Sequence, residues 1–125
     1  MRRDDDLIRQ LMLDLESATT AVNDAHQVNG YTRDEVAYHL GLILRAGLAE
    51  GPKPRYSDDG SDPTIPRLII VLRLTPAGHD FIDTLRDDTV WNKVKESSKK
   101  VGGSLSLDVL KQLGISVLKA QLGLP

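Results

Sequence analysis

Residues 35–48 constrain the fold of this chain more than any other stretch of its sequence. Their apolar side chains recur at the spacing of one helix face: Val36, Leu40, Ile43 and Gly47. Thr32 is placed to cap the helix, and Glu35 three residues later completes a capping box. Gly47 suits the left-handed position that ends many helices. The pattern predicts an amphipathic helix whose two ends are both specified by the local sequence.

The run VAYHLGLILRAGL, which starts at Val36, resembles the third helix of small bacterial winged-helix repressors. The apolar positions and the exit at residues 46–48 match those proteins. Three positions that are basic in the repressors carry Tyr38, Gly41 and Leu44 here. In the repressors, those basic side chains help to contact DNA phosphates or bases. The resemblance therefore implies a winged helix-turn-helix fold that lacks part of the usual DNA-reading surface.

The order of the remaining patterns predicts an α+β fold that is mostly helical. The expected helices cover residues 4–17, 76–86 and 107–122, and the last of these is capped by Ser104 or Ser106. One more helix is expected between the second and third of these, capped by Asp87 or Asp88 and ended by Gly102-Gly103. Residues 18–31 have weak periodicity and predict a loop with a short strand near 25–28, so the first half of the helix-turn-helix is reduced. Strands at 48–50 and 67–74, joined by a proline-rich loop over 51–66, should form the β-hairpin wing.

Two further runs, residues 74–95 and 99–110, resemble a family of small bacterial and prophage proteins catalogued as a domain of unknown function. Members of that family open with R-D-x-D-L-I-R, as residues 3–9 nearly do, and carry the run G-Y-x-x-x-E-V-x-Y-H-L. The resemblance implies a winged-helix domain over residues 1–86. A helical C-terminal extension over residues 87–125 would serve packing or dimerisation. The family label implies no activity.

Composition and charge limit the classes of function that are open to the chain. The 125 residues suit one domain with an extension, and the absence of cysteine excludes disulfides and cysteine-based metal sites. No transmembrane span or secretory signal is visible, so we expect a cytoplasmic protein without a membrane partner. The net charge of -2 is less basic than is usual for a nucleic-acid binder. The cationic excess lies in residues 87–125, with six basic and four acidic side chains.

DNA binding is the first functional hypothesis, for a small transcriptional regulator that acts as a homodimer on double-stranded DNA. The expected contacts come from the helix and the wing: Tyr38, Arg45, Lys53, Arg55 and Arg67. Phosphate contacts of this kind weaken steeply as salt is added. The alternative for the wing cations is that they solubilise an exposed hairpin and are balanced by Asp58, Asp59 and Asp62.

Protein interaction without DNA binding is the alternative hypothesis, for a phage or prophage accessory factor that modulates a host complex. The residues expected at such a surface are Leu42, Trp91, Leu110, Val117 and Leu118. A long apolar face on the last helix also favours a second copy of the chain as partner. Trp91 has a second interpretation, since a lone large aromatic residue is usually part of a core.

Catalytic chemistry has little support in the sequence. The histidines at positions 26, 39 and 79 are scattered, and no known catalytic or nucleotide-binding motif occurs. His79 and Asp83 stand four residues apart, but two donors do not make a metal site. The acidic run over residues 4–6 is better explained as a helix cap and first turn than as a metal site. We therefore expect no enzyme, no cofactor and no bound metal.

Overall fold

The computed structural model describes residues 1–102 and 105–125, so the predicted roles of Gly103 and Ser104 lie outside the described residues. The described residues form five helices and six short strands, which confirms the predicted α+β class. The strands pair two by two in antiparallel fashion. The chain divides into two compact units, residues 1–79 and 80–125, and the division falls within helix α3 (Pro76–Leu85). Among the described residues, no helix has the length and apolar character needed to cross a membrane.

Helix α1 (Asp5–Ser17) begins one residue later than predicted because Asp4 is its N-cap. The Asp4 carboxylate accepts a hydrogen bond of 3.1 Å from the backbone N–H of Leu7, which satisfies one free donor of the first turn. The apolar stripe of this helix is buried in full: Leu7, Ile8, Leu11, Met12 and Leu15. These side chains supply a large part of the core of the first unit.

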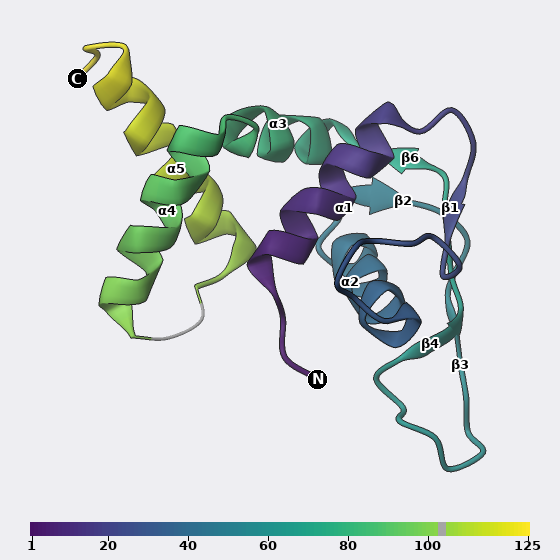
Figure 1. The fold of residues 1–125 in the computed structure, drawn as a ribbon. Coiled ribbons are helices and arrows are strands. Elements are labelled where there is room, and N and C mark those ends of the chain that lie inside the picture. Colours follow the sequence, from purple (N-terminus) through teal and green to yellow (C-terminus); the bar gives the residue numbers. More distant parts are fainter. Residues whose placement is uncertain (103–104) are drawn as a thin grey trace. The chain divides into compact units, whose positions relative to one another are not determined.

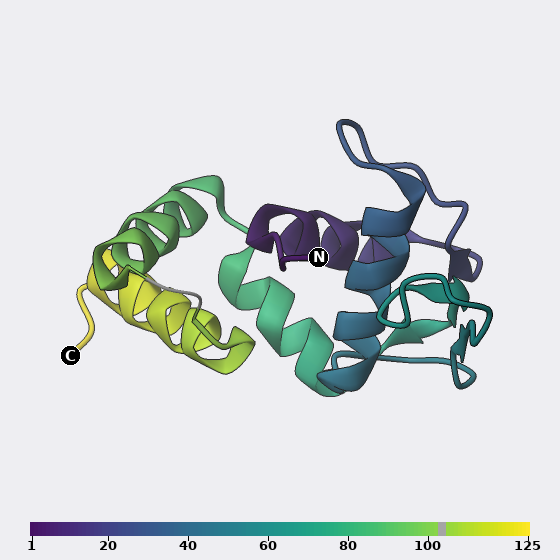
Figure 2. The same cartoon turned by 90° about the horizontal axis from the view of Figure 1, so that it is seen from below.

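Helix α2 (Arg33–Arg45) is the centre of the first unit and packs on α1 (Figures 1 and 2). Both halves of the predicted capping box are formed between Thr32 and Glu35. Gly47 has φ 75°, as predicted for the residue after the helix, and the N–H of Leu48 returns to the carbonyl of Ile43 at 3.1 Å. Val36, Leu40 and Ile43 are fully buried, so the predicted apolar face is confirmed.

The segment between α1 and α2 is a loop, as predicted, but its strand lies elsewhere. Strand β1 is Val22–Asn23, and the prediction of a strand near residues 25–28 was wrong. The reason is a turn directly after β1. The Asn23 side chain accepts a hydrogen bond from the N–H of Ala25 at 2.8 Å, and its carbonyl accepts one from the N–H of His26 at 3.0 Å. A chain bent in this way cannot continue as an extended strand.

Residues 66–74 form three short strands instead of the one predicted over 67–74. These are β4 (Pro66–Leu68), β5 (Ile70–Val71) and β6 (Arg73–Leu74). Strand β4 pairs with β3 (Arg55–Tyr56), β5 with β1, and β6 with β2 (Ala49–Glu50). The prediction was wrong because this one stretch passes three different partners in turn. Strand β3 also lies inside the segment that was predicted to be loop alone.

The second unit holds the end of α3 and two longer helices, α4 (Asp88–Val101) and α5 (Leu107–Gln121), which pack side by side (Figure 1). Asp87 and Ser106 cap them, two of the predicted caps, and Gly102 ends α4 with φ 76°. A Cβ atom at Gly114 would lie 2.7 Å from Cγ2 of Thr84, so α5 approaches the end of α3 closely. Val101, in the last turn of α4, is 66% exposed.

Candidate nucleic-acid interface

The β3–β4 hairpin lies against the outer side of α2 (Figure 2). The contact is made possible by Gly41, which is buried and has no side chain. A Cβ atom at this position would lie 3.3 Å from Cγ of Pro66 and 3.5 Å from the hydroxyl of Tyr56. The hairpin therefore covers the middle of the helix face that would have to enter a DNA groove.

Arg45 and Tyr56 link the end of α2 to the hairpin. Nη2 of Arg45 donates a hydrogen bond of 3.0 Å to the Tyr56 hydroxyl, and Cζ of Arg45 lies 5.8 Å from the centre of the Tyr56 ring. The distance and the aromatic partner are those of a cation–π contact. The pair fixes the orientation of an aromatic side chain that is still 38% exposed.

A cavity of about 450 Å³ opens beside this pair, between the end of α2, β2 and β3. Most of its wall is apolar and is made by Leu44, Ala49, Pro52, Pro54 and Tyr56. Its charged lining residues are Arg45, Lys53 and Glu50. The Glu50 carboxylate accepts a hydrogen bond of 2.7 Å from Arg73, so it pairs with neither of the two cations that line the cavity.

The five residues predicted to bind DNA are only partly brought together. Arg45 and Lys53 line the same cavity, and Arg55 is next to Tyr56 in β3. Tyr38 is half-buried, with its ring 5.3 Å from that of His39, and lies outside this cavity. Arg67 lies 3.6 Å from the carboxylate of Asp59 and lines a different cavity.

Tyr56 was not singled out from the sequence, although it joins the cavity to α2. A signal was present, because this chain is only 4% aromatic and Tyr56 stands in a polar, proline-rich loop. A lone aromatic residue in such a loop favours a contact over simple solvation. Nothing in the local sequence, however, indicates that its hydroxyl reaches back to Gly41 and Arg45.

Two of the five residues predicted for a protein surface are buried. Trp91 is 3% exposed and Leu110 is also buried, since large apolar side chains gain most from leaving water. Leu42, Val117 and Leu118 are half-buried. Among the described residues, the large apolar side chains that are exposed are different ones: Met1, Tyr56, Leu68 and Leu72 in the first unit, and Val101, Val109, Leu122 and Leu124 in the second.

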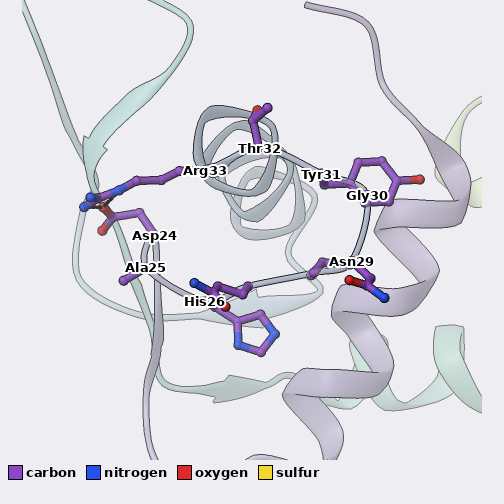
Figure 3. Close-up of a pocket in the computed structure, with 10 residues that line it drawn as sticks. Asp24, Ala25, His26, Asn29, Gly30, Tyr31, Thr32 and Arg33 are labelled. Atoms are coloured by element: carbon purple, nitrogen blue, oxygen red, sulfur yellow. Dashed lines mark hydrogen bonds and ion pairs between the residues drawn. The ribbon is translucent and has the colours of Figure 1, made fainter.

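Residues 24–33 enclose a second cavity, of about 490 Å³, at the N-terminal end of α2 (Figure 3). Several of its polar side chains form hydrogen bonds within the loop or with residues of the N-terminal segment. Arg33 donates to the buried carboxylate of Asp24, with Nε 3.0 Å from Oδ2, and the two side chains meet at one edge of the loop in Figure 3. His26 lies 2.9 Å from the carboxylate of Asp14 in α1. These pairs hold the loop in place.

Tyr31 completes the attachment of this loop to α1. Its hydroxyl donates a hydrogen bond of 2.9 Å to Asp4. Burial, together with this hydrogen bond and the negative charge of Asp4, raises the pKa of Tyr31 to about 12. The phenol therefore stays protonated as a donor. Among the described residues, no three metal-binding side chains gather in a group that could hold a metal ion.

Comparison with known proteins places these features in a family. The family model described as "Hypothetical protein (DUF2513)" matches residues 2–104. The chain belongs to the DUF2513 family. An "Uncharacterized protein" of Haemophilus influenzae is 36% identical to it over 124 residues, which cover 98% of this chain and 99% of that protein. No solved structure matches the chain significantly. DUF2513 membership confirms the expected relation to a family of unknown function, while a prophage origin stays a prediction.

Proposed function

We propose that this DUF2513 protein is a winged-helix DNA-binding protein, a small cytoplasmic transcriptional regulator that grips the phosphate backbone. The order of its elements supports a winged-helix description. Helix α1, strand β1 and helix α2 are followed by two antiparallel segments that pair through β2 and β6 and extend into the β3–β4 hairpin. The loop over residues 18–32 stands where a complete helix-turn-helix has its first helix.

The observation that carries the proposal is the pairing state of the cations. Arg33, Arg67 and Arg73 each lie within 4 Å of a carboxylate, at Asp24, Asp59 and Glu50 respectively. Three other cations of the same unit form no ion pair with any described carboxylate: Arg45, Lys53 and Arg55. Cations without a carboxylate partner can neutralise DNA phosphates and release counterions without first breaking an existing pair.

The covered face of α2 determines what kind of DNA binding is expected. Pro66 and Tyr56 occupy the space in front of Gly41, so the middle of α2 has no free path to base edges. Phosphate contacts position a protein on DNA but carry no sequence information directly. We therefore expect binding that is strongly dependent on salt and only weakly selective for sequence.

The test is the affinity of the full chain for a duplex, measured by fluorescence anisotropy at about 50 and about 200 mM salt. The variant Arg45→Gln, Lys53→Ala, Arg55→Ala should bind about tenfold or more weakly. Its slope of log affinity against log salt should shrink by about 0.9 for each phosphate that the variant no longer neutralises. The control Lys99→Ala, Lys100→Ala, Lys111→Ala removes the same charge from the second unit and should bind as the native chain does. No binding by the native chain at the lower salt concentration would overturn the proposal.

A second candidate function, self-association through α5, is favoured by the apolar side chains that this helix leaves exposed or half-exposed. Val109 is exposed, Val117 and Leu118 are half-buried, and Leu122 after the helix is 71% exposed. Such a stripe commonly becomes covered by a protein partner. Sedimentation of the native chain should show a concentration-dependent dimer that the Leu118→Asp, Leu122→Asp variant abolishes. A monomer at every concentration would exclude this role and leave a host protein as the partner to seek.

A further inference from the structure

We propose that the cavity beside Arg45 and Tyr56 receives an unstacked nucleobase, so that the protein prefers single-stranded DNA to an intact duplex. The inference rests on the proposed function and goes beyond it, because it names the nucleic-acid form that the same site would select. The phosphate next to the base would be held by Arg45 and Lys53. A duplex keeps its bases stacked and cannot offer one to a side cavity, whereas a single strand can.

The shape and chemistry of the wall suit a flat ring. The Tyr56 ring, the rings of Pro52 and Pro54, and the side chain of Leu44 provide apolar surface around about 450 Å³. The volume falls within the range of pockets that hold small ligands. Aromatic and guanidinium groups are the usual platforms on which proteins stack single-stranded bases, and Arg45 and Tyr56 supply one of each.

The charge of the lining residues selects an anionic ligand. Lys53 forms no ion pair with any described residue, and Arg45 is bonded to a neutral hydroxyl. The one lining carboxylate, Glu50, is engaged by Arg73 at 2.7 Å. A ligand that carries negative charge next to an apolar ring fits both parts of the lining, and a nucleotide has this combination.

The Tyr56 ring is also oriented by a hydrogen bond within the chain before any ligand arrives. The Tyr56 hydroxyl accepts a hydrogen bond of 3.0 Å from Arg45 and lies 3.5 Å from the place where a Cβ atom of residue 41 would stand. An aromatic side chain that is already oriented loses little conformational freedom on binding, which favours affinity. The part of the ring that remains exposed lines the cavity.

The experiment compares a labelled oligothymidylate with a blunt duplex of equal length, using the full chain at one fixed salt concentration. We expect the single strand to bind about tenfold more tightly than the duplex. Tyr56→Leu should abolish that preference, while Tyr56→Phe keeps the ring and should retain it. The control Leu68→Ala shortens an exposed apolar side chain in the same hairpin but outside the cavity, and it should behave as the native chain does.

Each outcome separates this inference from the proposed function. Equal binding of both forms, or a preference that survives Tyr56→Leu, overturns the nucleobase site and leaves duplex binding standing. Failure to bind either form overturns both. Tyr56-dependent binding of an oligoglutamate peptide as tight as that of the single strand would instead assign the cavity to an acidic peptide. If Tyr56→Leu does not fold, photocrosslinking of a bromouracil strand to the native chain tests the nucleobase site instead. A crosslink at Tyr56 supports the site, and crosslinks only elsewhere overturn it.

Discussion

Nε2 of the buried His39 accepts a hydrogen bond of 2.7 Å from the backbone N–H of Asp4. The other ring nitrogen, Nδ1, donates to the carbonyl of Glu35 at 2.7 Å. One ring thus ties the middle of α2 to the residue that caps α1. Because Nε2 must accept, the bond requires a neutral imidazole. His39 therefore joins the middle of α2 to the N-terminal end of α1.

Acidification below about pH 6.5 should destabilise the protein through His39. Burial lowers the pKa of this imidazole and outweighs the Glu35 carbonyl and nearby carboxylates, which raise it. Below pH 6.5, the ordinary pKa of histidine, His39 is protonated in the unfolded chain before it is protonated in the folded chain. The free energy of unfolding therefore falls as pH drops, by up to about 1.4 kcal/mol per pH unit. Urea unfolding at about pH 7.5 and 5.5 measures the effect. The difference in unfolding free energy between the two pH values should become smaller in His39→Gln. The control His79→Gln changes an exposed histidine and should keep the difference of the native chain. An unchanged pH dependence in His39→Gln would contradict the assignment.

Removal of Arg33 should cost about 1–3 kcal/mol of unfolding free energy, because it leaves a buried carboxylate without its cation. Asp24 is 5% exposed, and Nε of Arg33 donates to its carboxylate at 3.0 Å. Burial raises the pKa of Asp24, but the hydrogen bond and charge of Arg33 hold it below its ordinary value, so this stability is lost at low pH.

The matched control for Arg33→Ala is Arg73→Ala. Arg73 is bonded to Glu50 at a similarly exposed site where both side chains remain in water, and exposed pairs of this kind contribute about 0–1 kcal/mol. Urea unfolding at neutral pH compares the two variants. Equal losses would mean that the buried position of Asp24 has no energetic weight.

Gly78→Ala should destabilise the protein by about 3 kcal/mol or prevent folding, because a methyl group has no space at this position. A Cβ atom there would lie 1.8 Å from the carbonyl oxygen of Leu48, which also accepts a hydrogen bond from the N–H of Thr75. Backbone atoms cannot move aside as a flexible side chain does. Thermal unfolding checks the result, with the exposed neighbour Ala77→Ser as a control expected within about 0.5 kcal/mol of native. A native-like melting temperature in Gly78→Ala would refute the close approach.

Gly41→Lys should detach the β3–β4 hairpin from α2. The substitution restores a basic residue at a position where the resembling repressors carry one, but Pro66 and Tyr56 already occupy the space. We expect faster amide exchange in residues 55–68 and a stability loss of about 1–3 kcal/mol. Ala46→Lys adds the same charge at an exposed position and should leave the exchange unchanged. Protection of the hairpin in Gly41→Lys equal to that in the native chain would show that the contact is dispensable.

The helices follow from the sequence because their determinants are local. The capping box of Thr32 and Glu35, the acidic caps Asp4 and Asp87, and the glycine after α2 act within a few residues of the backbone groups they satisfy. Helical periodicity also identifies which face of a helix is buried in the core, as α1 and α2 demonstrate. Strands depend on partners far along the chain, so the single strand predicted over 67–74 became three.

The sequence by itself determined the α+β class and the five helices with most of their caps. It also showed that positions 38, 41 and 44, which are basic in the repressors that α2 resembles, are not basic here. Only the tertiary structure decided which cations are paired, that Tyr56 and Pro66 cover Gly41, and that Arg45 and Lys53 share one cavity. The physical reason is distance along the chain. Arg45 and Tyr56 are eleven residues apart and Gly41 and Pro66 still further, so their meeting depends on the packing of a hairpin whose register no local pattern encodes.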